Sequence, residues 1–168
     1  NGTSSGTQNR FGNQEQLFNR TEAERYVWQF TNERRVENGL NRVDYAPRIV
    51  LPAREHAQNM AQHDYVGHTQ PNGQTGEERY EDVCNYRGSG YTFGENAIGA
   101  WYNRNYEDRK TGNSYHADSE RELARHLVAR WMNSTGHREN ILNPSWEELG
   151  VGLHKREDGK VFVAQTFC

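Results

Sequence analysis

Residues 119–142 read SERELARHLVARWMNSTGHRENIL, and this stretch predicts a helix together with the point where it ends. Ser119 and Glu122 have the spacing of a capping box, in which each side chain binds the backbone N–H of the other residue. Apolar residues then recur at helical spacing, at Leu123, Ala124, Leu127, Val128, Trp131 and Met132. The helix should end near residues 134–136. We therefore expect a helix with one buried face and with His137 just beyond its end.

Two more helices are predicted upstream of this one. Residues 21–24 (TEAE) also have the capping-box form, and apolar residues follow at helical spacing until Gly39. A second apolar series predicts a helix over residues 47–64. Pro52 lacks a backbone donor and kinks a helix unless it lies in the first turn. This helix therefore either starts as predicted and contains Pro52 or begins nearer Leu51.

The C-terminal segment alternates at period two on either side of the turn Glu157-Asp158-Gly159, which predicts two antiparallel strands joined as a hairpin. Residues 65–116 are rich in glycine and predict loops with only short elements between them. Within them, the aromatic and polar residues 101–116 either form a recognition surface or pack on their own domain, and packing is favoured. Helices followed by a terminal hairpin predict an α+β domain with helices packed on a small sheet.

Length and composition limit the class of protein. At 168 residues the chain fits one domain. Residues 1–20, rich in Gly, Ser, Thr, Asn and Gln, predict a flexible N-terminal linker before a domain over residues 21–168. Lys and Arg number 20 against 23 Asp and Glu, and the charges alternate along the chain, so no nucleic-acid partner is expected. No apolar run approaches the roughly 20 residues of a membrane span. We expect a monomer without a transmembrane segment.

Cys84 and Cys168 are the two cysteines of the chain. They are either a disulfide that ties down the C-terminus or two unpaired thiols, and the even count favours the disulfide. Closing so long a loop would contribute about 4 kcal/mol in the chain-entropy account. Disulfides persist in oxidising compartments, so the pair favours a secreted or cell-surface protein.

Four stretches occur in this order: residues 64–73 (DYVGHTQPNG), 94–97 (GENA), 131–142 (WMNSTGHRENIL) and 149–152 (LGVG). Together they resemble the signature of the CAP superfamily (cysteine-rich secretory proteins, antigen 5 and pathogenesis-related 1) in its prokaryotic, SCP-like extracellular form. The match extends over about residues 21–168. The resemblance implies a three-layer α-β-α sandwich, with a small antiparallel sheet between helices and a large central cleft.

In animal and plant members of that family, two His and two Glu side chains face one another across the cleft and can hold a divalent metal. The resemblance places the first His on His68, the first Glu on Glu95 and the second His on His137. The second Glu position is Ser134 here, and a neutral hydroxyl is a poor zinc ligand. Two imidazoles, one carboxylate and a water are a known open zinc arrangement. The resemblance is therefore compatible with Zn²⁺ or another divalent cation at these three residues, without requiring one.

The residues themselves leave their roles open. His68 and His137 can ligate a metal or act as a base near neutral pH, or they can be structural. Glu95 is a candidate ligand, a candidate base, or a partner that fixes the tautomer of one of the two histidines. Two roles are open for Ser134: a nucleophile paired with His137, or a hydroxyl that hydrogen-bonds the last turn of the helix. The helix-end role is favoured because no Gly-x-Ser-x-Gly motif is present.

Three functions stay open at this point. The leading one is a secreted protein that binds a ligand in the cleft at His68, Glu95 and His137, the ligand being a lipid, peptide, glycan or protein partner. The second is an extracellular hydrolase in which Glu95 or a metal-bound water attacks a peptide or cell-wall bond and His137 carries the proton. The third is a structural surface module with a vestigial cleft. Whether the protein is an enzyme is left open, and binding is favoured.

Overall fold

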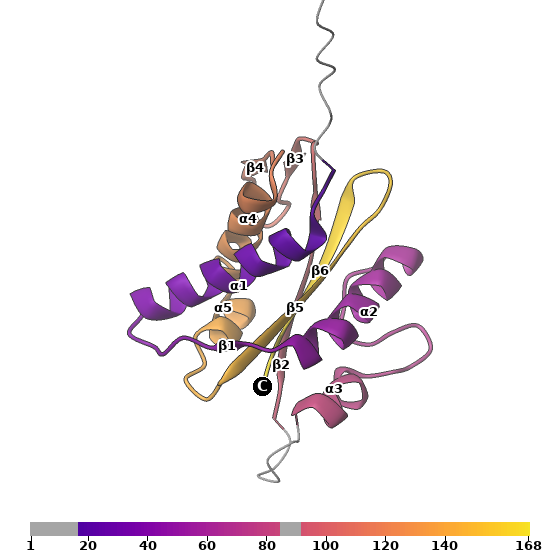
Figure 1. Ribbon diagram of the computed structural model, residues 1–168. Coiled ribbons are helices and arrows are strands. Elements are labelled where there is room, and N and C mark those ends of the chain that lie inside the picture. The colour runs from indigo at the N-terminus through magenta and orange to yellow at the C-terminus, as the bar shows by residue number, and fades with distance from the viewer. Residues whose placement is uncertain (1–16, 85–91) are drawn as a thin grey trace, which may run out of the picture.

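A four-stranded sheet lies between two groups of helices in the computed structural model, which describes residues 17–84 and 92–168 (Figure 1). The helices are α1 (Arg20–Glu37), α2 (Pro47–His63), α3 (Gly76–Cys84), α4 (Glu120–Met132) and α5 (Thr135–Ile141). The strands are β1 (Asp44–Tyr45), β2 (Gly94–Trp101), β3 (Tyr106–Glu107), β4 (Ser114–Tyr115), β5 (Glu148–Lys155) and β6 (Lys160–Phe167). Helices α1, α4 and α5 cover one face of the sheet, while α2 and α3 cover the other. The predicted α-β-α sandwich is confirmed.

The helix starts follow the capping residues, with one shift. In α4 the predicted cap is confirmed, since the Ser119 side chain accepts a hydrogen bond from the Glu122 N–H at 3.2 Å. In α1 the cap is Asn19, which accepts from the Glu22 N–H at 3.1 Å, so the cap predicted at Thr21 was wrong by two residues. Asn and Thr are both good caps, and sequence spacing alone does not choose between them.

Two further predictions are settled by α2 and α5. Helix α2 begins at Pro47 and contains Pro52, so the alternative start near Leu51 was wrong. Helix α4 ends at Met132, close to the predicted stop, but the chain then forms the short helix α5, which was not predicted. His137 therefore lies within a helix and not in a loop.

The sheet has the order β1-β5-β6-β2. Strands β5, β6 and β2 are antiparallel and the predicted hairpin is confirmed, but the two-residue β1 pairs with β5 in parallel, so the sheet is not wholly antiparallel. The eight-residue β2 was missed because its residues are buried on both faces of the sheet. A strand buried on both faces lacks the alternation of apolar and polar residues that reveals a strand in sequence.

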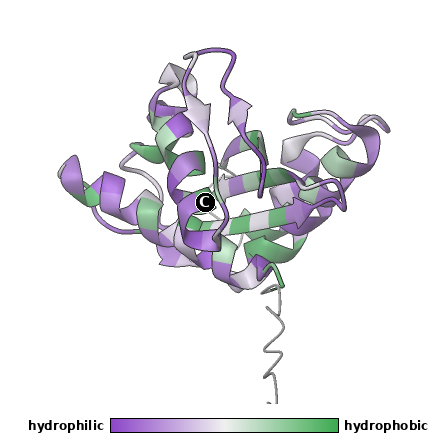
Figure 2. Ribbon diagram, turned by 90° about the horizontal axis from the view of Figure 1, so that it is seen from above, coloured by the Kyte–Doolittle hydropathy of each residue, from purple (hydrophilic) through white to green (hydrophobic). Residues whose placement is uncertain are grey.

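Strand β5 alternates large residues with glycine for a packing reason. Its apolar side chains enter the core shared with α1 and α4, whereas Gly150 and Gly152 face α2. A Cβ on Gly150 would lie 2.5 Å from the Ile49 Cβ, and one on Gly152 would lie 2.1 Å from the Ala53 carbonyl carbon. Helix α2 therefore lies directly against the backbone of β5. Figure 2 shows apolar residues concentrated on the central strands and the helix faces that meet them.

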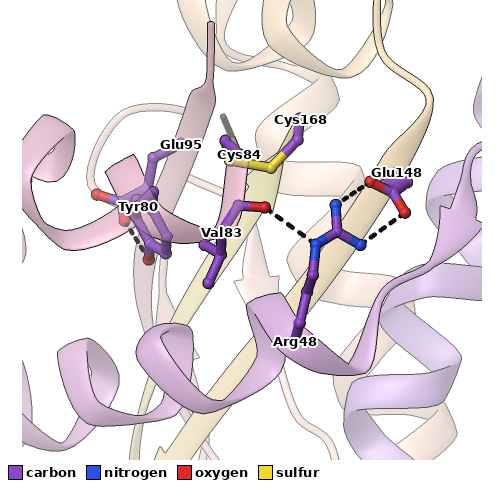
Figure 3. The surroundings of a disulfide bond; sticks show 7 residues. All are labelled: Arg48, Tyr80, Val83, Cys84, Glu95, Glu148 and Cys168. Atoms are coloured by element: carbon purple, nitrogen blue, oxygen red, sulfur yellow. Dashed lines mark hydrogen bonds and ion pairs between the residues drawn. A yellow bond between two sulfur atoms is a disulfide. The ribbon is translucent and has the colours of Figure 1, made fainter. Parts of the chain in front are cut away.

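The disulfide between Cys84 and Cys168 is present, with Cα atoms 5.3 Å apart. It joins the end of α3 to the residue after β6. Around it, Arg48 of α2 donates to the Val83 carbonyl and forms an ion pair with Glu148 of β5 (Figure 3). The second helical layer is thus tied to the sheet by one covalent and several polar links.

The N-terminal segment is described only from residue 17, so most of the predicted linker over residues 1–20 lies outside the described residues. Within the described part, Phe18 packs edge-on against Tyr102 with ring centroids 4.9 Å apart. No helix in the described parts of the chain is long and apolar enough to cross a membrane.

We predict that Gly152→Ala lowers the free energy of unfolding by about 2 kcal/mol or more, because overpacking a filled core costs about 1–3 kcal/mol. The atoms that the new methyl group meets belong to the backbone of α2 and have little freedom to move. Urea denaturation measures the change. Gly136→Ala is the matched control, since a Cβ there meets nothing within 4 Å. Equal stability of the two variants would contradict the prediction.

Candidate functional site

A cavity of about 750 Å³ follows the outer edge of β2. Its lining includes every residue from Ala97 to Trp101, together with His68, Ser134 and His137. Three of the four residues singled out in the sequence therefore share one cavity, and Glu95 does not line it. A second cavity of about 1210 Å³, between Phe18 and the hairpin turn, holds none of these four residues.

Glu95 lies on the α2 and α3 side of the sheet, and its side chain is only 2% exposed. The ring Nδ1 of His68 is 2.9 Å from Oε1. The Tyr80 hydroxyl donates to Oε2 at 2.7 Å, as Figure 3 shows. The Arg79 guanidinium lies 3.2 Å from both carboxylate oxygens and also donates to the His68 carbonyl at 2.9 Å. The carboxylate is thus engaged by three side chains. Of the roles left open for Glu95, this geometry supports a hydrogen-bonding partner of His68, with Nδ1 as the donor because a carboxylate only accepts.

The hydrogen bond between His68 and Glu95 shifts the pKa values of both groups in opposite directions. The hydrogen bond to Glu95 is the main cause that raises the pKa of His68 above its ordinary value of 6.5. Burial alone would raise the pKa of Glu95, but the hydrogen bond from His68 and the charge of Arg79 outweigh it and hold the pKa below 4.5. Folded His68 binds its proton more tightly than the unfolded chain does, and folded Glu95 binds its proton less tightly, so the pair contributes its full stabilisation between pH 4.5 and pH 6.5. That contribution is lost as the pH rises through the folded pKa of His68 or falls through the folded pKa of Glu95.

His56, which is fully buried on α2, contacts the loop that carries His68. Its Nε2 is 2.7 Å from the Gly67 carbonyl and 3.6 Å from Oε1 of Glu95. Burial is the main cause that lowers the pKa of His56, so the neutral ring donates its Nε2 proton to Gly67. The position of His68 is therefore fixed through its neighbour's backbone as well as through its own ring.

Sequence reasoning missed three supporting residues, namely His56, Arg79 and Tyr80. The signal for His56 is its place on the buried face of α2, between Ala53 and Ala57, where a histidine needs a polar partner. No comparable pattern marks the other two, because α3 was not predicted.

Asn96, the next residue of β2, points to the opposite face of the sheet. Its Nδ2 donates to the His137 carbonyl at 3.1 Å and to Oε1 of Gln165 at 3.1 Å. Its Oδ1 accepts from Nδ2 of Asn140 at 2.9 Å, which holds α5 against the strand. Consecutive residues of β2 thus bind the His68 ring and the His137 backbone carbonyl from opposite faces of the sheet, and both histidines line the cavity along its outer edge.

The pKa of His137 is shifted in the opposite direction to that of His68. Burial is the main cause that lowers the pKa of His137 below 6.5, and the charges of Lys110, His68 and Arg130 add to it. At pH 6.5 His68 is therefore more protonated than His137. Ser134 lies at the cap of α5 without a side-chain capping bond, and within residues 17–84 and 92–168 its hydroxyl forms no hydrogen bond to His137. The nucleophilic pair is not assembled in this structure.

The donor set fits a divalent cation only in part. Within the described residues, no three His, Cys, Asp or Glu side chains are grouped so that they could hold a metal ion. Glu95 is engaged by its three neighbours, so direct ligation by this carboxylate does not fit. The ring nitrogens of His68 and His137 are the groups that fit, with Glu95 behind His68 as a hydrogen-bonding partner.

The far wall of the cavity comes from residues 101–116, which pack on their own domain as favoured in the sequence. Arg130 of α4 binds the Asp108 carboxylate at 2.6 Å and the Gly99 carbonyl at 2.8 Å. Tyr106 and Tyr115 stack beside it, with ring centroids 5.5 Å apart. This packing places Arg109 and Lys110 at the cavity.

We predict that an NMR titration finds the pKa of His68 above 6.5 and that of His137 below it. In Glu95→Gln the pKa of His68 should fall toward 6.5, because an amide cannot stabilise the imidazolium as a carboxylate does. His126 is the internal control: its pKa is lowered mainly by burial and should not respond. An unchanged His68 pKa in the variant would show that Glu95 does not polarise it.

The sandwich, with paired histidines at the edge of β2, defines the class of protein as a CAP-type domain. The chain belongs to the cysteine-rich secretory protein (CAP) family, whose model matches residues 28–167. The resemblance found in the sequence is confirmed.

Two kinds of relative agree with this assignment. The uncharacterized protein YkwD of Bacillus subtilis is 29% identical over 142 residues, covering 84% of this chain and 46% of that protein. The chain thus spans about half the length of that relative. Among solved structures, an extracellular protein with an SCP domain from Bacillus anthracis has a TM-score of 0.64 at 22% identity, covering 88% of this chain and 40% of that one. An outer surface protein from Borrelia burgdorferi also has a TM-score of 0.64, at 18% identity, covering 89% of this chain and 94% of that one.

Proposed function

We propose that this domain is an extracellular ligand-binding module whose ligand lies in the cavity along β2, between His68 and His137. The observation that carries the proposal is that both histidines line one cavity, where Glu95 hydrogen-bonds the His68 ring and Asn96 donates to the His137 backbone carbonyl. Binding sites are typically concave and hold a few fixed polar groups among apolar ones.

An extracellular location is supported by the disulfide and by the similar structures, one described as an extracellular protein and one as an outer surface protein. Disulfides persist mainly in oxidising compartments.

The chemistry of the lining favours a ligand with an acidic group beside an apolar part. His68 holds its proton tightly, and Arg109 and Lys110 add positive charge on the far wall. Val66, Ile98 and Trp101 supply apolar surface in the same cavity. A carboxylate would therefore gain charge-assisted hydrogen bonds while its apolar neighbour is removed from water.

Binding of N-acetylvaline, a small carboxylate with an apolar side chain, tests this proposal. We expect it to shift the ring resonances of His68 and His137, and His137→Ala should weaken binding about tenfold, the loss for one charge-assisted hydrogen bond. His154→Ala is the matched control, because this partly buried histidine of β5 lies outside the cavity.

Two other results would contradict the ligand-binding proposal and favour one of the alternative functions. Cleavage of peptide or cell-wall substrates that is lost in a folded His137→Ala protein would favour the hydrolase. Ring resonances that do not respond to N-acetylvaline would overturn ligand binding at this site and favour a vestigial cleft.

We further propose that Zn²⁺ or a similar divalent cation binds Nε2 of His68, with release of the proton on that nitrogen, and a ring nitrogen of His137. Such an ion would supply positive charge for an anionic ligand. Calorimetric titration with Zn²⁺ should show binding that is lost in His137→Ala and weakened about tenfold or more in Glu95→Gln, as expected for a residue that orients a ligand from behind. His154→Ala should bind as the wild type does. A wild-type protein that binds no Zn²⁺ would overturn the metal proposal and leave the metal-free site standing.

A further inference from the structure

The outer edge of β2 carries backbone groups that the sheet does not use. Within the described residues, β6 is its only strand partner. In an antiparallel pair, alternate residues direct their N–H and C=O groups toward the partner and away from it. The Tyr102 N–H bonds back to the hairpin at Gly159. The carbonyls of Gly99 and Glu95 instead accept from Arg130 and Asn140, so odd-numbered residues of β2 point outward.

Ala97 lies midway between these two capped carbonyls. By the same alternation its N–H and C=O point outward, and so does the Gly99 N–H. In the part of the chain that the structure describes, none of these three groups has a hydrogen-bond partner. Ala97 is only 5% exposed, and buried backbone polar groups are nearly always paired. The Ala97 groups are therefore open to a hydrogen-bonding partner from outside the described chain, water or a bound segment, and the Gly99 N–H belongs to a half-buried residue beside them.

The two capping side chains leave the middle of the edge open. Edge strands are commonly protected by charged groups or by a covering segment. Here Arg130 and Asn140 protect the two ends, while Ala97 and Gly99 face the cavity. Beside them stands Val66, 49% exposed, whose Cγ2 would lie 3.4 Å from a Cβ on Gly99. Val66 can therefore contact an apolar side chain on an added strand, in which every second side chain points to the same face.

The charges that line the cavity indicate which peptide segments would bind there. Four cations line it, of which Arg130 pairs with Asp108 and Lys160 pairs with Asp64. The other two, Arg109 and Lys110, form no ion pair within the described residues. Glu107 is the remaining acidic residue of the lining, so the cavity carries an excess of positive charge. An acidic segment is complementary to it.

We propose that the cavity takes an extended peptide of acidic character, which adds a strand to the outer edge of β2 by pairing its backbone with Ala97 and Gly99. This inference rests on the proposed function and names the class of its ligand. In such strand addition, main-chain hydrogen bonds give affinity, and pockets for alternate side chains give specificity.

The probe is a pool of capped pentapeptides, Ac-Xaa-Val-Glu-Val-Xaa-NH₂, compared with the same pool carrying Lys in place of Glu. Amide hydrogen exchange measured by NMR should slow at Ala97 and Gly99 about fivefold or more when the Glu pool binds, as expected for each backbone hydrogen bond gained. The Lys pool should bind more weakly. Reversing the charge with Arg109→Glu and Lys110→Glu together should reverse this preference.

Backbone methylation of the peptide tests the pairing without altering the protein. In the best-binding peptide, N-methylation at the residues whose N–H faces β2 should weaken binding about fivefold or more, while methylation at the alternate residues should not. Ala97→Pro provides the matching change in the protein, because proline is tolerated on an edge strand where the lost N–H points away from the sheet. It should weaken peptide binding about fivefold or more, as N-methylation of the peptide does.

The outcomes separate this inference from the proposed function. Peptides that shift the His68 and His137 resonances without protecting Ala97 and Gly99 would overturn strand addition and retain the cavity as a binding site. Binding of N-acetylvaline but of neither peptide pool would do the same. A protein whose cavity responds to none of these probes would overturn both.

Discussion

The buried carboxylate of Glu95 is the contact on which the rest of the site depends. A carboxylate removed from water is costly unless it is paired and hydrogen-bonded. Here Arg79 and Tyr80 from α3 and His68 from the loop before it meet this need together. The electrostatic requirement of one side chain thus holds a helix and a loop against the sheet. The same requirement sets the protonation of the ring that faces the cavity.

The arrangement of the site follows from the geometry of a single strand. Side chains alternate across a β-sheet, so Glu95 and Asn96 necessarily serve opposite faces. Such neighbours can organise one site only where the two faces come together, which is at the edge of the sheet. The position of β2 outside β6 is therefore as important to the site as the identity of the histidines.

The sequence predicted the parts of this fold that have regular patterns. The stripe of α4, its Ser119 cap and the terminal hairpin all follow from local periodicity, and the structure contains each of them. Strand β2 and helix α5 escaped detection because one is buried on both faces and the other is only seven residues long. The family signature located His68, Glu95 and His137, but spacing could not show that Glu95 is buried behind His68 and does not line the cavity. That depends on the register of β2, which is a tertiary property.

The disulfide has a consequence for the chemistry of the cavity. It fastens the last residue of α3 to the end of the chain, and α3 carries both Arg79 and Tyr80. In a reducing environment this helix would keep only its non-covalent contacts, and the counter-charge of Glu95 would be held less firmly. The disulfide thereby helps to hold in place the partners of Glu95, the residue whose hydrogen bond raises the pKa of His68.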